Sequence, residues 1–349
     1  MKLFFALFLL LCLYLLLLEL YPVKRLRTKK SRAELYALPE LYIYSFELHV
    51  HSQFSYDSLG KPEDIAEAAR REGIDYVIVT DHEDDRVKHF AGDRIVAGME
   101  KKLLGEEGRV LGDLLLAGEL RVVAHPFKEK YRWQLELPEE YLFELIDLKD
   151  ALLERKGMLF LMLPYLLLVG LLSRSRAVES LKKIIPLEKY ATQYLKMRIA
   201  NRVVGGLDHH VKVYIREVGI RFLFPSYRYS FRLMRNFLLT DQKVTDREQF
   251  LQSLKTGSTL ISFSEKPTLF WRDGQSLKVF PPAECLLHRK SLQEEEWQEG
   301  SFFEFFLPPG TQVFMGYTYA FRLGSLCFGL KPLFLFVCRE EENGRVASA

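Results

Sequence analysis

Short strand-like runs that alternate with helical patterns are the feature that most constrains how this chain can fold. Between residues 45 and 206, five runs rich in β-branched residues are typical of buried strands that end in polar residues: YSFELHV, DYVIVTDH, RIVAGME, RVVAHP and NRVVGGLDHH. KPEDIAEAARREGI, between the first two, is typical of a helix, because Pro62 suits the first turn and Gly73 suits the end. The alternation predicts a parallel α/β architecture, in which chemistry gathers at the carboxyl ends of the strands.

Histidines and carboxylates stand where these strands are expected to end. Five of the eight histidines fall there, and carboxylates accompany them: His49, His51, His82, His125 and His210, with Asp57, Asp81, Glu100 and Asp208. Because residues i and i+2 of a strand face the same side, His49 and His51 can reach one ion. Imidazole and carboxylate donors without thiolates suit Mn, Fe or Zn in a multinuclear hydrolytic site. A chance pair of packed histidines explains His49 and His51 alone, but not five strand ends.

Composition excludes two other classes of site. The formal net charge is only +3, so no broad basic field argues for nucleic acid, and no nucleic-acid partner is expected. The four cysteines show neither a close pair nor zinc spacing, so a disulfide framework and thiolate ligation are not expected: Cys12, Cys285, Cys327 and Cys338.

The ordered motifs HVHSQFSYD, TDH, GME, AHPF and GLDHH resemble those of the PHP (polymerase and histidinol phosphatase) superfamily. The resemblance covers about residues 45–211, and it implies a distorted (β/α)7 barrel that holds two or three divalent metal ions (Mn, Fe or Zn). It implies a first ion at His49, His51, Glu100 and Asp208, a second shared by Glu100 and His125, and a third at Asp57, His82 and His210. The activity it implies is that of a metal-dependent phosphoesterase, which hydrolyses a phosphate mono- or diester with a metal-activated water. Polymerase members are excluded, because so short a chain has no palm or finger segments.

One position departs from the family pattern. The family usually supplies another histidine in a GHVLG context after the GxE glutamate, whereas this chain has GRVLG with Arg109. Arginine cannot ligate a cation, so three interpretations stay open. Arg109 contacts the substrate phosphate, or the second ion is held weakly, or the alignment slips and Arg109 is exposed. Asp81 is expected to orient His82 rather than to act as a base, and His209 supports the ligands, donates a proton to the leaving group, or is a packed histidine.

Residues 1–32 are interpreted as a membrane anchor with a basic flank. Residues 3–18 carry no charge, and residues 20–23 extend the apolar run past Glu19, close to the ~20 residues that cross a bilayer. No small-x-small cleavage site follows, which favours an uncleaved anchor over a signal peptide. The bases between Lys24 and Arg32 predict that the catalytic domain lies in the cytoplasm.

A second apolar run, residues 157–173, lies between His125 and Asp208. A single crossing of the membrane would separate these two residues, although both are needed in one metal cluster, so it is excluded. Its uncharged residues reach about 22 Å, short of the ~30 Å hydrocarbon core. Two interpretations remain: a helix packed on protein, or a dip into one leaflet bent at Pro164, which the flanking bases favour.

These observations divide the chain into an anchor (1–32), a PHP metallohydrolase domain with the apolar insertion (40–225), and a helix plus a small β-rich C-terminal domain (226–349). The text LQSLKTGSTLISF and the β-rich tail after it resemble the carbaryl-hydrolase-like branch of the family. That branch includes hydrolases of other bonds, so hydrolysis of an ester, amide or carbamate is an alternative, and a non-catalytic metal-binding membrane scaffold is a second. The expected partners are a phosphorylated small molecule or lipid-linked substrate, and membrane lipids.

Overall fold

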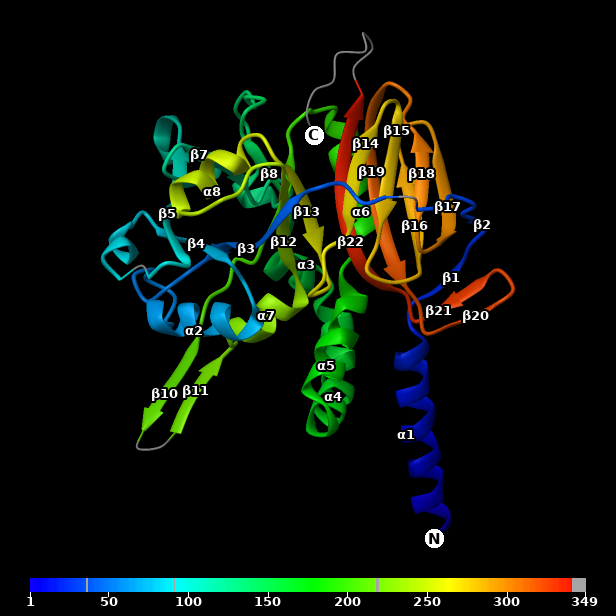
Figure 1. Cartoon of the computed structure of the whole chain (residues 1–349). Helices are drawn as coiled ribbons and strands as arrows, with labels where there is room; N and C mark the ends of the chain where they lie inside the picture. Colours follow the sequence, from blue (N-terminus) through cyan, green and yellow to red (C-terminus); the bar gives the residue numbers. More distant parts are fainter. Residues whose placement is uncertain (36, 91, 218–219, 341–349) are drawn as a thin grey trace.

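One long sheet organises the molecule (Figure 1). The computed structural model describes residues 1–35, 37–90, 92–217 and 220–340. Within these residues the sheet has 14 strands, in the order β2-β17-β16-β19-β22-β13-β12-β3-β4-β5-β6-β7-β8-β9. The fold is therefore mixed α/β, with a β-rich C-terminal region and an apolar N-terminal helix.

The consecutive strands from β3 to β9 carry the strand ends that the sequence predicts. Their bounds are β3 (Tyr42–Val50), β4 (Tyr76–His82), β5 (Ile95–Leu104), β6 (Val110–Ala117), β7 (Leu120–Ala124), β8 (Leu142–Asp147) and β9 (Val203–Gly206). Neighbours are parallel except around β6, which runs antiparallel to both β5 and β7. The predicted parallel architecture does not extend to β6, because the connections that flank it are too short to hold a crossover helix. After β9 the chain returns to β3, since the Leu207 N–H donates to the Leu48 carbonyl (3.0 Å) and the His209 N–H to the His49 carbonyl (3.2 Å).

The helices pack on this part of the sheet or project from it (Figure 1). They are α2 (Pro62–Glu72), α3 (Leu148–Glu154), α4 (Lys156–Leu172), α5 (Arg174–Leu181), α6 (Leu187–Met197), α7 (Tyr227–Leu233) and α8 (Arg247–Leu254), with short 3-10 turns η1 (Arg86–His89), η2 (Glu106–Gly108), η3 (Glu129–Tyr131) and η4 (Lys182–Ile184). Helix α2 confirms its sequence signals: Pro62 opens the first turn, and Gly73 caps the end with a left-handed φ of 66°. Its apolar stripe, Ile65, Ala68 and Ala69, is buried.

The rest of the chain is mainly β. Its strands are β1 (Val23–Arg25), β2 (Lys29–Lys30), β10 (Val213–Glu217), β11 (Ile220–Phe224), β12 (Arg235–Thr240), β13 (Ser258–Ser262), β14 (Leu269–Asp273), β15 (Ser276–Phe280), β16 (Cys285–Lys290), β17 (Glu295–Gly300), β18 (Phe303–Phe306), β19 (Gly310–Thr318), β20 (Phe321–Leu323), β21 (Leu326–Phe328) and β22 (Lys331–Glu340). The hairpin predicted at Asp273-Gly274 is confirmed by the β14–β15 pairing. Because β12 pairs with β3, and β13 with β22, the predicted boundary at residue 225 does not separate two sheets.

Helix α1 (Lys2–Leu20) stands away from the sheets (Figure 1) and, among the described helices, is the one long and apolar enough by itself to cross a membrane. Its C-terminal half packs on α4: the Tyr14 hydroxyl donates to the Leu161 carbonyl (2.7 Å), and Leu18 lies in one apolar cluster with Met162 and Tyr165. The predicted apolar insertion is thus α4, which meets α3 at a bend of 94°. Apart from Met162 and Tyr165, its side chains are exposed or half-buried.

Candidate metal centre

Five histidines and three carboxylates from different strand ends converge on one point. The Nε2 atoms of His49 and His51 lie 3.3 and 3.4 Å from Glu100 Oε2, and His82 Nδ1 lies 2.9 Å from the same oxygen. The other Glu100 oxygen lies 3.5 Å from His125 Nε2. Asp208 Oδ1 lies 3.5 Å from His51 Nε2. Glu100 therefore stands between two halves of the cluster, as a bridging ligand would.

A third group lies on the more open side. Asp57 Oδ1 is 3.0 Å from His210 Nε2 and 3.6 Å from His82 Nε2. The donor atoms of His51, His82 and His210 also lie within 4.8 Å of one another. The structure thus brings together all eight ligands expected from the sequence, and their assignment to particular ions stays a prediction.

The donor set fits divalent cations, because several of its atoms are buried and unsatisfied. Among the described residues these atoms have no hydrogen-bond partner: His49 Nε2, His51 Nε2, His210 Nε2, Asp57 Oδ1 and Glu100 Oε2. Buried polar atoms are normally paired, so a group of such orphans that face one another needs an explanation. Cations held by imidazole and carboxylate donors satisfy all of them together.

Carboxylates lie within hydrogen-bond distance of the Nδ1 atoms of two ligand histidines. His49 Nδ1 lies 2.7 Å from Glu144 Oε1, and His125 Nδ1 lies 3.1 Å from both Asp147 Oδ2 and Asp150 Oδ2. A ring nitrogen that donates to a carboxylate carries the proton, so the opposite Nε2 keeps its lone pair for a metal. Glu144 also accepts the His125 backbone N–H at 2.8 Å, so it positions two ligands at once.

The electrostatics keep the carboxylates ionised. Burial alone would raise the pKa of Glu100, but the imidazoles of His49 and His125 outweigh burial and hold the pKa well below its usual value. The pKa of Asp208 is likewise lowered, against burial, by its contacts with His210 and His49. Carboxylate, not carboxylic acid, is the form that binds a cation.

The backbone is strained at three of the expected ligand residues. His49, His125 and Asp208 have φ values of 62°, 48° and 43°, in the left-handed region that non-glycine residues rarely occupy. Such conformations cost about 1–3 kcal/mol each and are typical of functional sites. Gly206 makes room beside them, because a Cβ there would lie 1.6 Å from Glu144 Oε1.

Four further acidic residues, which the sequence did not predict, lie on β8, α3 and β6: Glu144, Asp147, Asp150 and Asp113. Asp113 is buried, and burial together with the Glu100 charge raises its pKa to about 6. The run LFELID is a strand that ends in an acid, which is the same signal that identified the other strands. It lies outside the five motifs that carry the family resemblance, so the sequence predicts no site residue there.

Three described lysines rim the centre, and each binds a carboxylate of the cluster. Lys149 Nζ lies 2.6 Å from Asp208 Oδ2, Lys128 Nζ lies 2.7 Å from Asp150 Oδ1, and Lys212 Nζ lies 3.1 Å from Asp57 Oδ2. Their side chains are at least one-third exposed. The rim therefore offers positive charge to an anionic substrate.

A cleft of about 310 Å³ opens beside His125 and Asp147. Phe127, Leu153 and Tyr190 give it an apolar wall next to the acidic residues. It is large enough for an organic group attached to the reacting centre.

Asp81 does not have the predicted position. Its carboxylate accepts the Ser52 N–H (2.6 Å), the Ser52 hydroxyl (2.7 Å) and the Ser55 hydroxyl (2.9 Å). Neighbouring residues of a strand face opposite sides, so Asp81 points away from His82 and cannot orient it. It positions the loop after β3 instead.

Arg109 lies outside the centre. It is exposed at the turn between β5 and β6, and its Nη2 donates to the Gln134 side chain. The two strands remain paired from Glu100↔Leu115 to Leu104↔Val110, which carries the turn about 13 Å from Glu100. Of the three interpretations, the geometry favours an exposed arginine.

His209 also points away from the ligands. Its Nδ1 lies 2.6 Å from Ser230 Oγ, and its ring packs on Tyr227 with centroids 4.5 Å apart. Burial, followed by the nearby His210, lowers its pKa to about 3. The prediction of a proton donor is wrong, and His209 is the packed histidine of the alternative.

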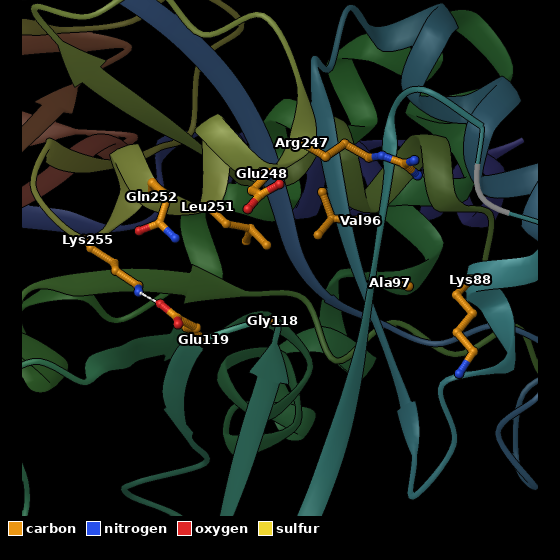
Figure 2. A pocket seen from close by; sticks show the side chains of 10 residues that line it. All are labelled: Lys88, Val96, Ala97, Gly118, Glu119, Arg247, Glu248, Leu251, Gln252 and Lys255. Atoms are coloured by element: carbon orange, nitrogen blue, oxygen red, sulfur yellow. Dashed lines mark hydrogen bonds and ion pairs between the residues drawn. The ribbon is translucent and has the colours of Figure 1, made fainter.

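A larger hollow of about 470 Å³ lies elsewhere, against α8, with Arg247, Leu251 and an ion pair between Lys255 and Glu119 on its wall (Figure 2). None of the metal-centre residues lines it. Volume alone therefore does not identify the reactive site in this molecule.

Part of the chain matches a known protein family. The family model of the PHP domain matches residues 47–203. No curated protein matches the chain. Among solved structures, a two-domain protein from Bacteroides vulgatus ATCC 8482, which contains a predicted PHP-like metal-dependent phosphoesterase, is similar with 11% identity and a TM-score of 0.38, over 90% of this chain and 99% of that chain. The family match therefore rests on residues 47–203.

Proposed function

Because residues 47–203 are a PHP domain, we propose that this chain is a membrane-associated, metal-dependent phosphoesterase that hydrolyses a phosphate mono- or diester. The observation that carries the proposal is the group of unpartnered donor atoms around Glu100, among the described residues, rimmed by Lys128, Lys149 and Lys212. In the same proposal, β3 to β9 correspond to the distorted (β/α)7 barrel of the family.

The chain's own residues would bind and orient. His49, His51, Glu100 and Asp208 would hold one ion, Glu100 and His125 a second, and Asp57, His82 and His210 a third. When bound, such ions polarise a phosphoryl oxygen and activate water. The rim lysines attract the anionic ester, and the cleft beside His125 accepts one of its organic groups.

The proposal is tested with a substrate panel and a metal analysis on the full chain. We expect His51→Ala and Asp208→Ala to lower hydrolysis of bis-p-nitrophenyl phosphate or p-nitrophenyl phosphate by more than about 100-fold, and to lower bound metal. His89→Ala, at an exposed histidine outside the centre, is the matched control. Preference for p-nitrophenyl acetate would favour the ester, amide or carbamate hydrolase. Metal binding without turnover of any substrate would favour the scaffold.

Membrane attachment is the second part of the proposal. Helix α1 has the length and hydropathy of a spanning anchor, and α4 packs against its C-terminal half. The bases after α1 favour a cytoplasmic catalytic domain, and α4 would dip into the same leaflet. A lipid-linked phosphate ester is the substrate that such a location favours. Protease accessibility of residues 21–340 in oriented vesicles tests the sidedness.

A further inference from the structure

The β10–β11 hairpin has two unlike faces. The pairs Val213↔Phe224 and Ile215↔Phe222 place their side chains together on one face. The members of this apolar hairpin face are 41–60% exposed: Val213, Ile215, Ile220, Phe222 and Phe224. The Phe222 and Phe224 rings are parallel, with centroids 6.5 Å apart. Glu217, which pairs with Ile220, is also exposed on this face, so its described part is apolar except for one carboxylate at the outer end.

The opposite face holds the hairpin to the domain. Arg221 forms ion pairs with Asp64 and Glu67 of α2, the second at 2.9 Å. Tyr214 and Leu223 are half-buried against the main core. The hairpin is thus fixed with its apolar face turned outward, although a contiguous exposed apolar patch is unfavourable in water. We therefore expect another molecule to cover this apolar face.

The direction in which the hairpin projects indicates what covers its apolar face. The hairpin, α4 and α1 all project from the same side of the molecule (Figure 1). Phe160, Leu167, Leu171 and Leu172 of α4 are between 63% and 86% exposed, so this side carries apolar side chains on three separate elements. Arg216 of the hairpin is exposed where anionic head groups would meet it, whereas Lys212 and Arg221 already form ion pairs with Asp57 and with α2.

We propose that the apolar hairpin face enters the interface of the bilayer that α1 spans, as a third membrane contact. This inference rests on the membrane attachment proposed above. The inference also sets the position of the metal centre relative to the membrane. Val213 follows His210 by three residues, which reach at most about 10 Å, so the centre lies close to the base of the hairpin. Lys212, at the base of the hairpin, binds Asp57. The phosphate of the substrate is therefore carried by a membrane lipid and lies at head-group level.

Site-specific fluorescence in nanodiscs of phosphatidylcholine and phosphatidylglycerol tests the inference on the full chain. An NBD label is attached to Phe222→Cys in a Cys12→Ser background, since Cys285, Cys327 and Cys338 are buried. Ile215→Cys, on the same face, serves if the first variant does not fold. Phe306→Cys is the matched control, since Phe306 is 63% exposed and ends β18, far from the hairpin (Figure 1). Cys12 labelled in the natural sequence reports on α1.

We expect doxyl lipids to lower the emission at positions 12 and 222 by about twofold, and to leave position 306 unchanged. Quenching at 12 without quenching at 222 overturns the inference and leaves the anchor intact. A blue-shifted but unquenched label at 222 means that protein covers the face, and also overturns it. Quenching at neither position removes both the anchor and the inference, and quenching at 306 as well shows non-specific adsorption.

The substrate class has its own test. Phe222→Glu should lower hydrolysis of a phosphate ester lipid in vesicles by about tenfold, equivalent to ~1.4 kcal/mol, without changing turnover of soluble bis-p-nitrophenyl phosphate. Phe306→Glu should change neither rate. Equal loss on both substrates, or on neither, overturns the lipid-borne substrate.

Discussion

At the scale of single residues, Ser55 shows how the centre fixes its own protonation. Its hydroxyl has one proton, which it donates to Asp81 Oδ1 (2.9 Å). It must then accept from His51 Nδ1 (2.9 Å) and from the His82 backbone N–H (3.1 Å). The His51 proton is therefore on Nδ1, and Nε2 faces Glu100 with its lone pair. Asp81 supports a ligand through this hydroxyl.

Glu144→Gln should weaken metal binding without unfolding the chain. Both Glu144 oxygens accept hydrogen bonds from the His49 ring and the His125 backbone, whereas an amide has only one acceptor oxygen. We expect about 10–100-fold lower affinity for Mn²⁺ or Zn²⁺, measured by competition with a chromogenic chelator. Glu139→Gln, at an exposed side chain, should bind metal normally. Equal affinities in the two variants would contradict the role of Glu144.

Gly206→Ala should disturb the same pair by sterics alone. The new Cβ would lie 1.6 Å from Glu144 Oε1, so the carboxylate must move. We expect a loss of about 1–3 kcal/mol in the free energy of unfolding, with weaker metal binding, measured by denaturant titration and by the chelator assay. At Gly92 an added Cβ meets nothing within 4 Å, so Gly92→Ala is the matched control. A stable Gly206→Ala that binds metal normally would be inconsistent with this packing.

His288 predicts an acid-sensitive C-terminal region. It is 1% exposed and stacks on Trp297, and burial lowers its pKa to about 4. The unfolded chain takes up a proton near pH 6.5, but the folded chain does so only near pH 4, so this stability is complete above pH 6.5 and is lost as the pH falls. The loss is on the order of 3 kcal/mol at pH 4. Denaturant titrations at pH 7.5 and 4.5 should show a smaller loss for His288→Phe than for the natural chain. An equal loss would show that His288 is not the sensor.

At the scale of elements, a buried lysine joins the anchor to the domain. Lys183 Nζ donates to the Leu18 and Glu19 carbonyls at 3.2 and 2.8 Å, which caps the last turn of α1. Arg176 adds an ion pair to Glu19 (3.2 Å). Helix α1 is therefore clamped to α5 and η4 as well as packed on α4.

Lys183→Met should loosen this clamp. The substitution keeps the apolar stem but removes a charged donor, which is worth about 1.5–3 kcal/mol. We expect hydrogen–deuterium exchange in the last turn of α1 to become roughly tenfold faster in detergent. Lys156→Met, at an exposed position, is the control. Unchanged exchange in Lys183→Met would argue against the clamp.

The elements also show what the sequence could predict. Five strands combine a β-branched run with a histidine or carboxylate at or near the end: β3, β4, β5, β7 and β9. These strands and all eight expected ligands could therefore be predicted from the sequence. β6 and β8 lie outside the five motifs that resemble the family, so their acidic residues were not predicted. β5 and β6 form a hairpin that is paired from Glu100↔Leu115 to Leu104↔Val110, and a match to the family motif does not give the length of such a hairpin. Asp81 and His82 are adjacent along β4, but adjacent residues of a strand face opposite sides, so their spacing does not predict a contact.

At the scale of the whole molecule, the continuous sheet couples the C-terminal region to the metal centre. β12 pairs with β3, the strand that ends at His49 and His51, and β13 pairs with β22. Loss of the C-terminal strands would expose one edge of β3. The molecule is therefore expected to unfold as one unit.

Metal removal tests this coupling. Each ion at about 100 times its Kd adds ~2.7 kcal/mol to the free energy of unfolding, so chelation should lower the Tm of the entire chain by about 5 °C for each ion that is removed. Calorimetry before and after chelation should show one transition that moves. A second transition that stays in place would mean that the two regions unfold independently.

The clamp at Glu19 and Lys183 leaves no slack between the anchor and the catalytic domain. An enzyme on a flexible linker can reach substrates over a range of distances from the membrane, set by the length of the linker. A catalytic domain fixed to its anchor reaches only substrates at one distance from the membrane surface. In the proposed arrangement its encounters with substrate are two-dimensional, governed by lateral diffusion and by the surface density of the lipid. Its rate would follow mole fraction in the membrane, and dilution of the vesicles would leave it unchanged.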